Sequence, residues 1–166
     1  KAGIKPIIGC EIYVATGSRF EKKTTAESGW GNNHLILLAQ NYTGYKNLMK
    51  LVTAGYLEGF YYRPRVDVEL LRQYSEGLIC MSACLKGEIP EKMLRGNYEG
   101  AKEAALRFAE IFPDRFYLEI QNHGIPEEEA NIKNMKKLAA DLDLPLVCTN
   151  DAHYAKQSHW EAHDIH

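Results

Sequence analysis

The residues best suited to do chemistry in this chain follow a short apolar run at positions 144–149. Asp151 and His153 follow shortly after it, two positions apart. If the backbone is still extended there, both side chains point the same way, because alternate residues of a strand share a face. A carboxylate and an imidazole in this arrangement can hold a divalent cation or a phosphate-bound water. The alternative is a polar loop in which Asp151 caps the next turn.

Two more candidates, Cys84 and His123, fall just past apolar runs at 77–82 and 116–121. A thiolate is a strong ligand for borderline metals, although a lone cysteine is otherwise a small core residue. In α/β folds, chemistry collects at the carboxyl ends of the strands. We therefore expect Cys84 and His123 to lie near Asp151 and His153, around a shared metal or phosphate centre.

Glu11 and His34 are the remaining candidates near the start of the chain. Glu11 interrupts the apolar run 7–14, and a buried carboxylate is costly unless it is paired, hydrogen-bonded or bound to metal. Alternatively, Glu11 faces solvent or sits in a bulge opened by Gly9. His34 opens the apolar run 34–39, where the alternative is a hydrogen-bonded histidine at a strand edge.

Strands and helices are predicted to alternate along the chain. The predicted strands are 7–14, 34–39, 77–82, 116–121 and 144–149, and the 144–149 strand is expected to be buried. Helices are predicted after a Thr43 cap, after an Asp67 cap, at 87–94, at 98–112, after Pro126 and from Ser158. This order favours parallel strands with helical crossovers, in an α/β barrel or a doubly wound sheet. Residues 15–33 are rich in Gly, Ser, Thr, Lys and Asn and predict a long mobile loop.

The composition indicates a soluble globular protein and gives no sign of a membrane protein. Of 166 residues, 45% are hydrophobic and 25% charged. No apolar run approaches the roughly 20 residues of a membrane span, and no signal peptide is visible. The net charge of -2 offers no global attraction to nucleic acid or an anionic membrane. The four cysteines, each in or beside an apolar run, are interpreted as reduced thiols of a cytosolic protein.

The segment 59–65 combines aromatic and basic residues, including Arg63 and Arg65. Such a segment can stack on bases and contact phosphate. Alternatively, its tyrosines cover the core and its arginines are solvated or paired.

Four separated blocks, at 2–11, 57–65, 82–90 and 149–154, together resemble the polymerase and histidinol phosphatase (PHP) domain found in bacterial replicative DNA polymerase III alpha subunits. The resemblance implies a distorted seven-stranded β/α barrel with up to three metal ions at its mouth. It implies that the metal ligands are Glu11, His34, Cys84, Asp151 and His153. His123 and Asn150 would orient a ligand or a bound phosphate. Zinc, manganese or iron would suit this mixed ligand set.

The chain departs from the family pattern at both ends. The family's His-x-His and Asp-His blocks would precede Lys1, and the polymerase carboxylates, which use magnesium, would follow His166. We therefore expect residues 1–166 to form the C-terminal portion of one PHP domain, a partial barrel cut at both ends. We also expect this fragment to be inactive alone.

The resemblance implies that the chain is part of a DNA-directed DNA polymerase, a nucleotidyltransferase of the bacterial cytoplasm. Its partners would be primer-template DNA and other replisome subunits, and no membrane. Its PHP domain would be a phosphoesterase-type module that supports 3′–5′ proofreading exonuclease activity or serves as a scaffold for a separate proofreading subunit. The alternatives are a stand-alone metal phosphoesterase, similar to histidinol phosphatases, and a non-catalytic interaction module.

Overall fold

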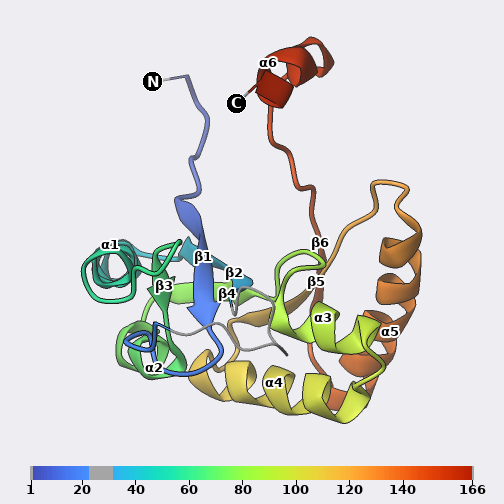
Figure 1. The fold of residues 1–166 in the computed structure, drawn as a ribbon, viewed down its shortest axis with the longest axis horizontal. Helices are drawn as coiled ribbons and strands as arrows, with labels where there is room; N and C mark the ends of the chain where they lie inside the picture. The colour runs from blue at the N-terminus through green and yellow to red at the C-terminus, as the bar shows by residue number, and fades with distance from the viewer. Residues whose placement is uncertain (1, 23–31, 166) are drawn as a thin grey trace.

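The fold is built on one six-stranded sheet, seen in a computed structural model that describes residues 2–22 and 32–165 (Figure 1). The strands lie in the order β3-β1-β2-β4-β5-β6. Their bounds are Gly9–Ala15 (β1), Asn32–Ala39 (β2), Arg65–Val66 (β3), Leu78–Met81 (β4), Phe116–Ile120 (β5) and Leu146–Cys148 (β6). Five of the six match predicted strands, and β3 was missed because two residues are too short to show an apolar period.

The direction of the strands differs in part from the prediction. β4, β5 and β6 run parallel, as do β1 and β3, but β2 is antiparallel to both β1 and β4. The expectation of parallel strands throughout is therefore wrong for β2, because an antiparallel neighbour needs no crossover helix. Among the described residues, β3 and β6 end the sheet and do not pair with each other. The chain has a mixed α/β fold, and the predicted barrel is not confirmed.

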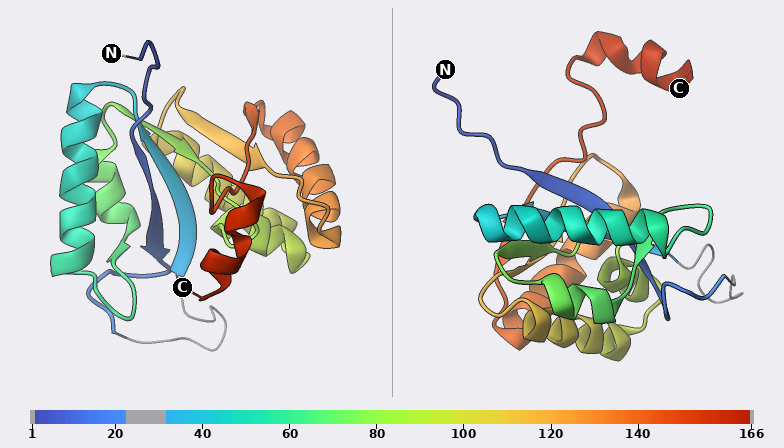
Figure 2. Two further views of the ribbon diagram at one scale, coloured as in Figure 1. Left: turned by 90° about the horizontal axis from the view of Figure 1, so that it is seen from above. Right: turned by 90° about the vertical axis from the view of Figure 1, so that its left-hand side faces the viewer.

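The described residues form six α-helices, of which the first five flank the sheet: α1 (Tyr42–Leu57), α2 (Val68–Tyr74), α3 (Glu88–Leu94), α4 (Tyr98–Ile111), α5 (Pro126–Leu142) and α6 (Trp160–Ile165). α1 packs against α2 and against β2 and β3, whereas α3 packs on α4 and α5, and α5 packs on β5. Figure 2 shows α6 and the N-terminal segment extending away from this body on the same side. No helix in the described part of the chain is long and apolar enough to cross a membrane.

Two helix starts test the predicted caps. Asp67 accepts a hydrogen bond from the backbone N–H of Leu70 at 3.0 Å, which confirms it as the cap of α2. The cap of α1 is Asn41, which accepts from the N–H of Gly44 at 2.9 Å, and not the predicted Thr43. Both residue types cap helices well, so the backbone path out of β2 decides between them.

The hydrophobic core lies between the sheet and the helices. Its largest fully buried side chains include Leu35, Leu37, Leu51, Leu71, Leu78, Phe108, Phe112, Leu118, Met135 and Leu138. All four cysteines are free thiols, as predicted, and Cys80 is fully buried in this core.

The predicted strand at 144–149 is shorter and less buried than expected. β6 has three residues, and its Leu146 is 38% exposed. Among the described residues, β6 is the last strand of the sheet and has a single neighbouring strand, β5. The predicted loop at 15–33 lies partly outside the described residues. Within the described part, Arg19 forms ion pairs with Glu58 at 2.7 Å and with Asp67 at 3.1 Å.

Candidate metal centre

Three of the predicted ligands meet at one nitrogen atom. His34 Nδ1 lies 3.1 Å from Glu11 Oε1 and 3.6 Å from Cys84 Sγ. The His34 side chain is 15% exposed and that of Glu11 is 39% exposed. The group therefore lies near the surface, and Glu11 is not the buried carboxylate that its apolar neighbours suggested.

The strand register explains why these residues converge. Tyr13 of β1 is paired with His34 of β2, and Glu11 lies on the same face of β1 as Tyr13. Glu11 is therefore a diagonal neighbour of His34. Because β2 is antiparallel to β4, the start of β2 lies beside the end of β4, and the N–H of His34 donates to the carbonyl of Lys86 at 3.0 Å. The turn after β4 thus brings Cys84 to the same imidazole.

The charges within this group favour a protonated imidazole and an ionised carboxylate. The Cys84 sulfur and the Glu11 carboxylate raise the pKa of His34 to about 9. The hydrogen bond from His34 lowers the pKa of Glu11, with further help from the charges of His153 and Lys86. A divalent cation could replace the proton on His34 and satisfy the same carboxylate and sulfur.

The two separations measured from His34 Nδ1 are close to those between ligand atoms of a tetrahedral metal ion. Zn–N, Zn–O and Zn–S bonds at tetrahedral angles place nitrogen about 3.4 Å from oxygen and about 3.6 Å from sulfur. The observed separations from His34 Nδ1 are 3.1 Å to Glu11 and 3.6 Å to Cys84. Within the described residues, however, no group of three or more His, Cys, Asp or Glu side chains is arranged to hold a metal ion.

A second polar group lies past the ends of β5 and β6. His153 Nε2 is 3.3 Å from Asp151 Oδ1, so these two side chains meet as the sequence predicted. The backbone N–H of Asp151 donates to His123 Nε2 at 3.2 Å. The other ring nitrogen of His123, Nδ1, lies 2.7 Å from Glu128 Oε1. Glu128 thereby orients His123, which in turn holds the segment that carries Asp151.

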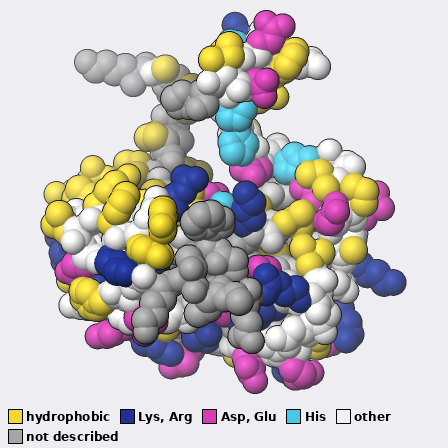
Figure 3. All heavy atoms as spheres, in the orientation of Figure 1, with side chains coloured by type: hydrophobic (Ala, Val, Ile, Leu, Met, Phe, Trp, Pro, Cys, Tyr) yellow, Lys and Arg dark blue, Asp and Glu magenta, His cyan; other side chains and the backbone are white. Residues whose placement is uncertain are grey.

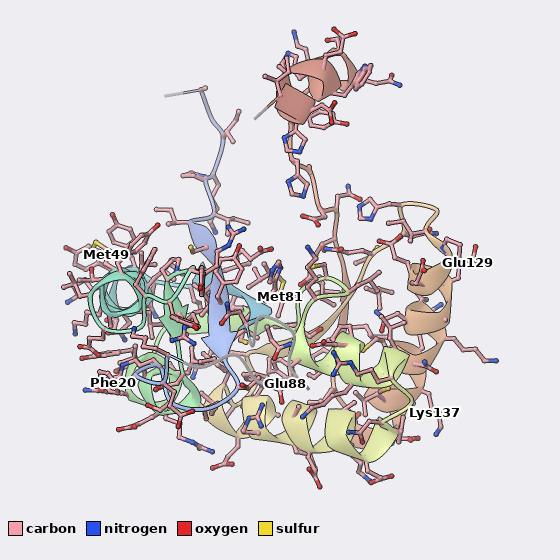
Figure 4. The ribbon with its side chains drawn as sticks, in the orientation of Figure 1. Phe20, Met49, Met81, Glu88, Glu129 and Lys137 are labelled. Atoms are coloured by element: carbon pink, nitrogen blue, oxygen red, sulfur yellow. The ribbon has the colours of Figure 1, made fainter. Side chains whose placement is uncertain are left out.

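Glu128 differs sharply from the neighbouring glutamates of α5. It is 4% exposed, whereas Glu129, labelled in Figure 4, is exposed. Burial alone would raise the pKa of Glu128, but the hydrogen bonds from the His123 side chain and backbone lower it below its ordinary value. The sequence did not separate Glu128 from its neighbours, because all three fit the favourable charge at a helix start.

Several histidine side chains, cyan in Figure 3, lie on the upper part of the face shown. The positive charge of His153 is close enough to lower the pKa of Glu11. In the described residues, no hydrogen bond or ion pair joins Asp151 or His153 to the first group. The structure therefore brings the five predicted ligands together as a cluster of three and a neighbouring pair.

The remaining predicted site residues have different surroundings. Arg65 is 3% exposed and donates to the carbonyls of Gly59 and Glu21 at 2.9 and 2.8 Å, which matches the paired alternative and leaves no free face for nucleic acid. Arg63 is exposed, and its guanidinium lies 5.5 Å from the ring centroid of Tyr13, next to His34. Asn150 is exposed. Roles for Arg63 and Asn150 stay predictions.

Sequence reasoning missed Lys86 and Glu119. Lys86 is an exposed residue of the turn after β4, and its charge acts on Glu11. Glu119 is 3% exposed and accepts a hydrogen bond from the N–H of Ala83 at 3.0 Å. The signal for Glu119 was present, because it is a carboxylate inside an apolar strand, as Glu11 is.

Comparisons with known proteins show which family the sequence resembles. The chain is 50% identical over 165 residues to a DNA polymerase III subunit alpha from Borreliella burgdorferi, covering 99% of this chain and 14% of that protein. It is 49% identical to the DNA polymerase III subunit alpha of Treponema pallidum, covering 98% of this chain and 14% of the relative. For that of Thermus aquaticus, the identity is 45%, over 98% of this chain and 13% of the relative.

The chain thus spans only about one seventh of the length of these relatives. The similarity to them extends through Asp151 and His153, whereas the sequence model of the PHP domain family matches residues 1–123. That match contains Glu11, His34 and Cys84, the three residues that meet in the structure, and the chain belongs to the PHP domain family.

Proposed function

We propose that this chain is the metal-binding part of a PHP domain in a bacterial replicative DNA polymerase III alpha subunit. The observation that carries the proposal is the convergence of Glu11 and Cys84 on one nitrogen of His34, at 3.1 and 3.6 Å. The named relatives add that this module occurs within alpha subunits of DNA polymerase III. They do not favour a stand-alone phosphatase.

Glu11, His34 and Cys84 would hold one metal ion, and Asp151 and His153 would complete or bridge to a neighbouring one. Mixed oxygen, nitrogen and sulfur donors suit zinc, manganese or iron. In a complete site with up to three ions, such a centre supplies a bound water of lowered pKa for attack on a phosphodiester.

The protein's own residues would position the substrate and the ligands. Glu128 and His123 orient the Asp151 segment, as buried partners of a ligand commonly do. Lys86 and Arg63 place positive charge beside the centre, where a phosphate of a DNA 3′ end would lie. We propose that Asn150 contributes a further polar contact to that phosphate.

In the parent protein, this centre would support 3′–5′ proofreading, while nucleotide transfer to primer-template DNA would use magnesium at carboxylates elsewhere. A PHP domain without activity would instead serve as a scaffold for a separate proofreading subunit. The parent would work in the bacterial cytoplasm with other replisome subunits.

The test is Asp151→Asn in the full-length parent. We expect less bound metal and weaker 3′–5′ exonuclease activity, with primer extension largely unchanged, because the amide loses the charge that a metal ligand supplies. Asp114→Asn is the matched control, since Asp114 lies in the turn before β5, at the opposite end of that strand. Unchanged metal content in Asp151→Asn would remove Asp151 from the ligand set.

A further inference from the structure

We propose that the buried carboxylate of Glu119 positions both ligand-bearing segments of the metal centre. One segment is the turn at 82–84, which carries Cys84, and the other is the exit from β6 at 149–153, which carries Asp151 and His153. The inference rests on the proposed metal centre and assigns it a residue that does not touch the metal.

On the first side, Glu119 holds the turn through two hydrogen bonds. Its Oε2 accepts from the backbone N–H of Ala83 at 3.0 Å, and its own N–H donates to Ser82 Oγ at 2.8 Å. Ala83 has a φ of 63°, in the left-handed region that residues with a Cβ rarely adopt. Cys84 follows at once, with its sulfur 3.6 Å from His34 Nδ1. The contact to Ala83 therefore stabilises a strained turn that aims Cys84 at His34.

The turn has a second constraint that leaves it little room to move. A Cβ at Gly87 would lie 2.1 Å from the carbonyl oxygen of Ser82. The N–H of Gly87 donates to the carbonyl of Cys84 at 2.8 Å. Glu119 thus fixes a turn whose two ends are already close to each other.

On the second side, Glu119 holds the chain as it leaves β6. Its Oε1 accepts from the hydroxyl of Thr149, and Gln121 Nε2 donates to the same oxygen at 3.3 Å. Gln121 Nε2 also donates to Thr149 Oγ1 at 3.2 Å. Thr149 lies two residues before Asp151. One carboxylate therefore joins the segments that carry the two groups of candidate ligands.

The fold alone gives little reason for a carboxylate at this position. Glu119 is 3% exposed, and no Lys, Arg or His of the described residues forms an ion pair with it. A buried charge without a counter-charge is costly, and an apolar side chain would fill a buried strand position more cheaply. Two groups that donate hydrogen bonds to the Glu119 carboxylate instead lie on the two segments that carry the candidate ligands. Partners of this kind tune metal affinity.

The experiment uses cobalt in place of the native metal in the full-length parent, and Cys84→Ser identifies the thiolate-to-cobalt absorption band. Glu119→Ala should weaken cobalt binding about 10-fold or more and reduce this band, because the turn no longer holds Cys84 beside His34. Asp67→Ala is the matched control. Asp67 is also 3% exposed and also accepts backbone N–H bonds, but it lies at α2, away from the centre. The Asp67→Ala variant should be less stable than the wild-type protein and keep the thiolate-to-cobalt band.

Two further variants separate positioning from folding. Glu119→Gln should keep the band, because its amide oxygen still accepts from Ala83; its NH₂ can donate to the Thr149 hydroxyl, and only the 3.3 Å contact from Gln121 is lost. Thr149→Val releases only the β6 side, so it should keep the band and still weaken cobalt binding. This pair keeps the test decisive even if Glu119→Ala does not fold.

The outcomes distinguish this inference from the metal centre itself. If Glu119→Ala binds cobalt with wild-type affinity and shows a thiolate-to-cobalt band of wild-type intensity, the positioning role is overturned and the metal centre stands. Equal loss of the band in Asp67→Ala would also overturn it, because general destabilisation would then explain the effect. A wild-type protein whose spectrum is unchanged by Cys84→Ser would overturn the metal centre and the positioning role together.

Discussion

At the scale of single residues, His34 is the centre of the candidate site. One ring nitrogen faces both a carboxylate and a sulfur, and these partners raise its pKa to about 9. Metal ligands must be deprotonated, so a metal ion has to displace the proton that these same partners favour. Metal binding at this site is therefore coupled to pH over a range set by Cys84 and Glu11.

We predict that metal affinity rises as pH increases from 7 to 9 and levels off above that. Metal binding should release a proton in this range, measurable by calorimetry in buffers of different ionisation enthalpy. In the absence of metal, the free energy of unfolding changes with pH in the opposite direction. A raised pKa in the folded state gives stability that is complete below the ordinary value of 6.5 and is lost as pH rises through about 9.

Glu11→Gln provides the control for this pH dependence. It removes one of the two groups that raise the pKa of His34, so the proton release should move to lower pH. Metal affinity that is constant between pH 7 and 9 in the wild-type protein would contradict the assignment of His34 as a ligand.

At the scale of elements, the helix caps show how local chemistry and chain path combine. α1 could begin with either Asn41 or Thr43 as judged by residue type, and the structure uses Asn41. α1 packs against β2, β3 and α2, so its start fixes one side of the sheet that carries Glu11 and His34. Asp67 caps the start of α2 and also forms an ion pair with Arg19, in the segment after β1.

We predict that Asn41→Ala lowers the free energy of unfolding by about 1 kcal/mol, because the N–H of Gly44 loses its acceptor. Thr43→Ala, at the position that sequence alone favoured, should change it by less than about 0.5 kcal/mol. Urea denaturation of the two variants in parallel would compare them. A larger loss in Thr43→Ala would mean that the helix begins later than the structure indicates.

At the scale of the whole molecule, the five candidate ligands form a cluster of three and a neighbouring pair. A zinc site takes about four ligands, so five side chains cannot fill a centre of three ions. The sheet is open among the described residues, with β3 at one end and β6 at the other. The chain also covers only 12–15% of its relatives.

We therefore predict that the purified chain of residues 1–166 does not hydrolyse DNA 3′ ends above background, even with excess zinc or manganese. The assay is release of the terminal nucleotide from a labelled primer, with the full-length parent as the positive control. Robust turnover by the chain alone, abolished by Asp151→Asn, would contradict this and would mean that five ligands suffice.

The sequence by itself determined most of the elements and supplied the candidate site residues. Apolar runs located five strands, and cap and proline signals located α2 and α5. These succeed because helix and strand periods and caps are local properties. Cys84, His123 and Asp151 were correctly placed past strand ends, and Asp151 and His153 do meet, because they are near neighbours along the chain.

Only the tertiary structure decided the direction of β2, the edge position of β6 and the contacts between distant residues. The pairing of His34 with Glu11 and Cys84 depends on β2 running antiparallel to β1 and β4, and no local pattern specifies strand direction. Glu119 stands out in the sequence only as a carboxylate inside an apolar strand, and its hydrogen bond with the turn at Ala83 is seen only in the folded chain. Hydrogen bonds between residues 30 or more positions apart depend on how the whole chain packs, so they appear only when the fold is complete.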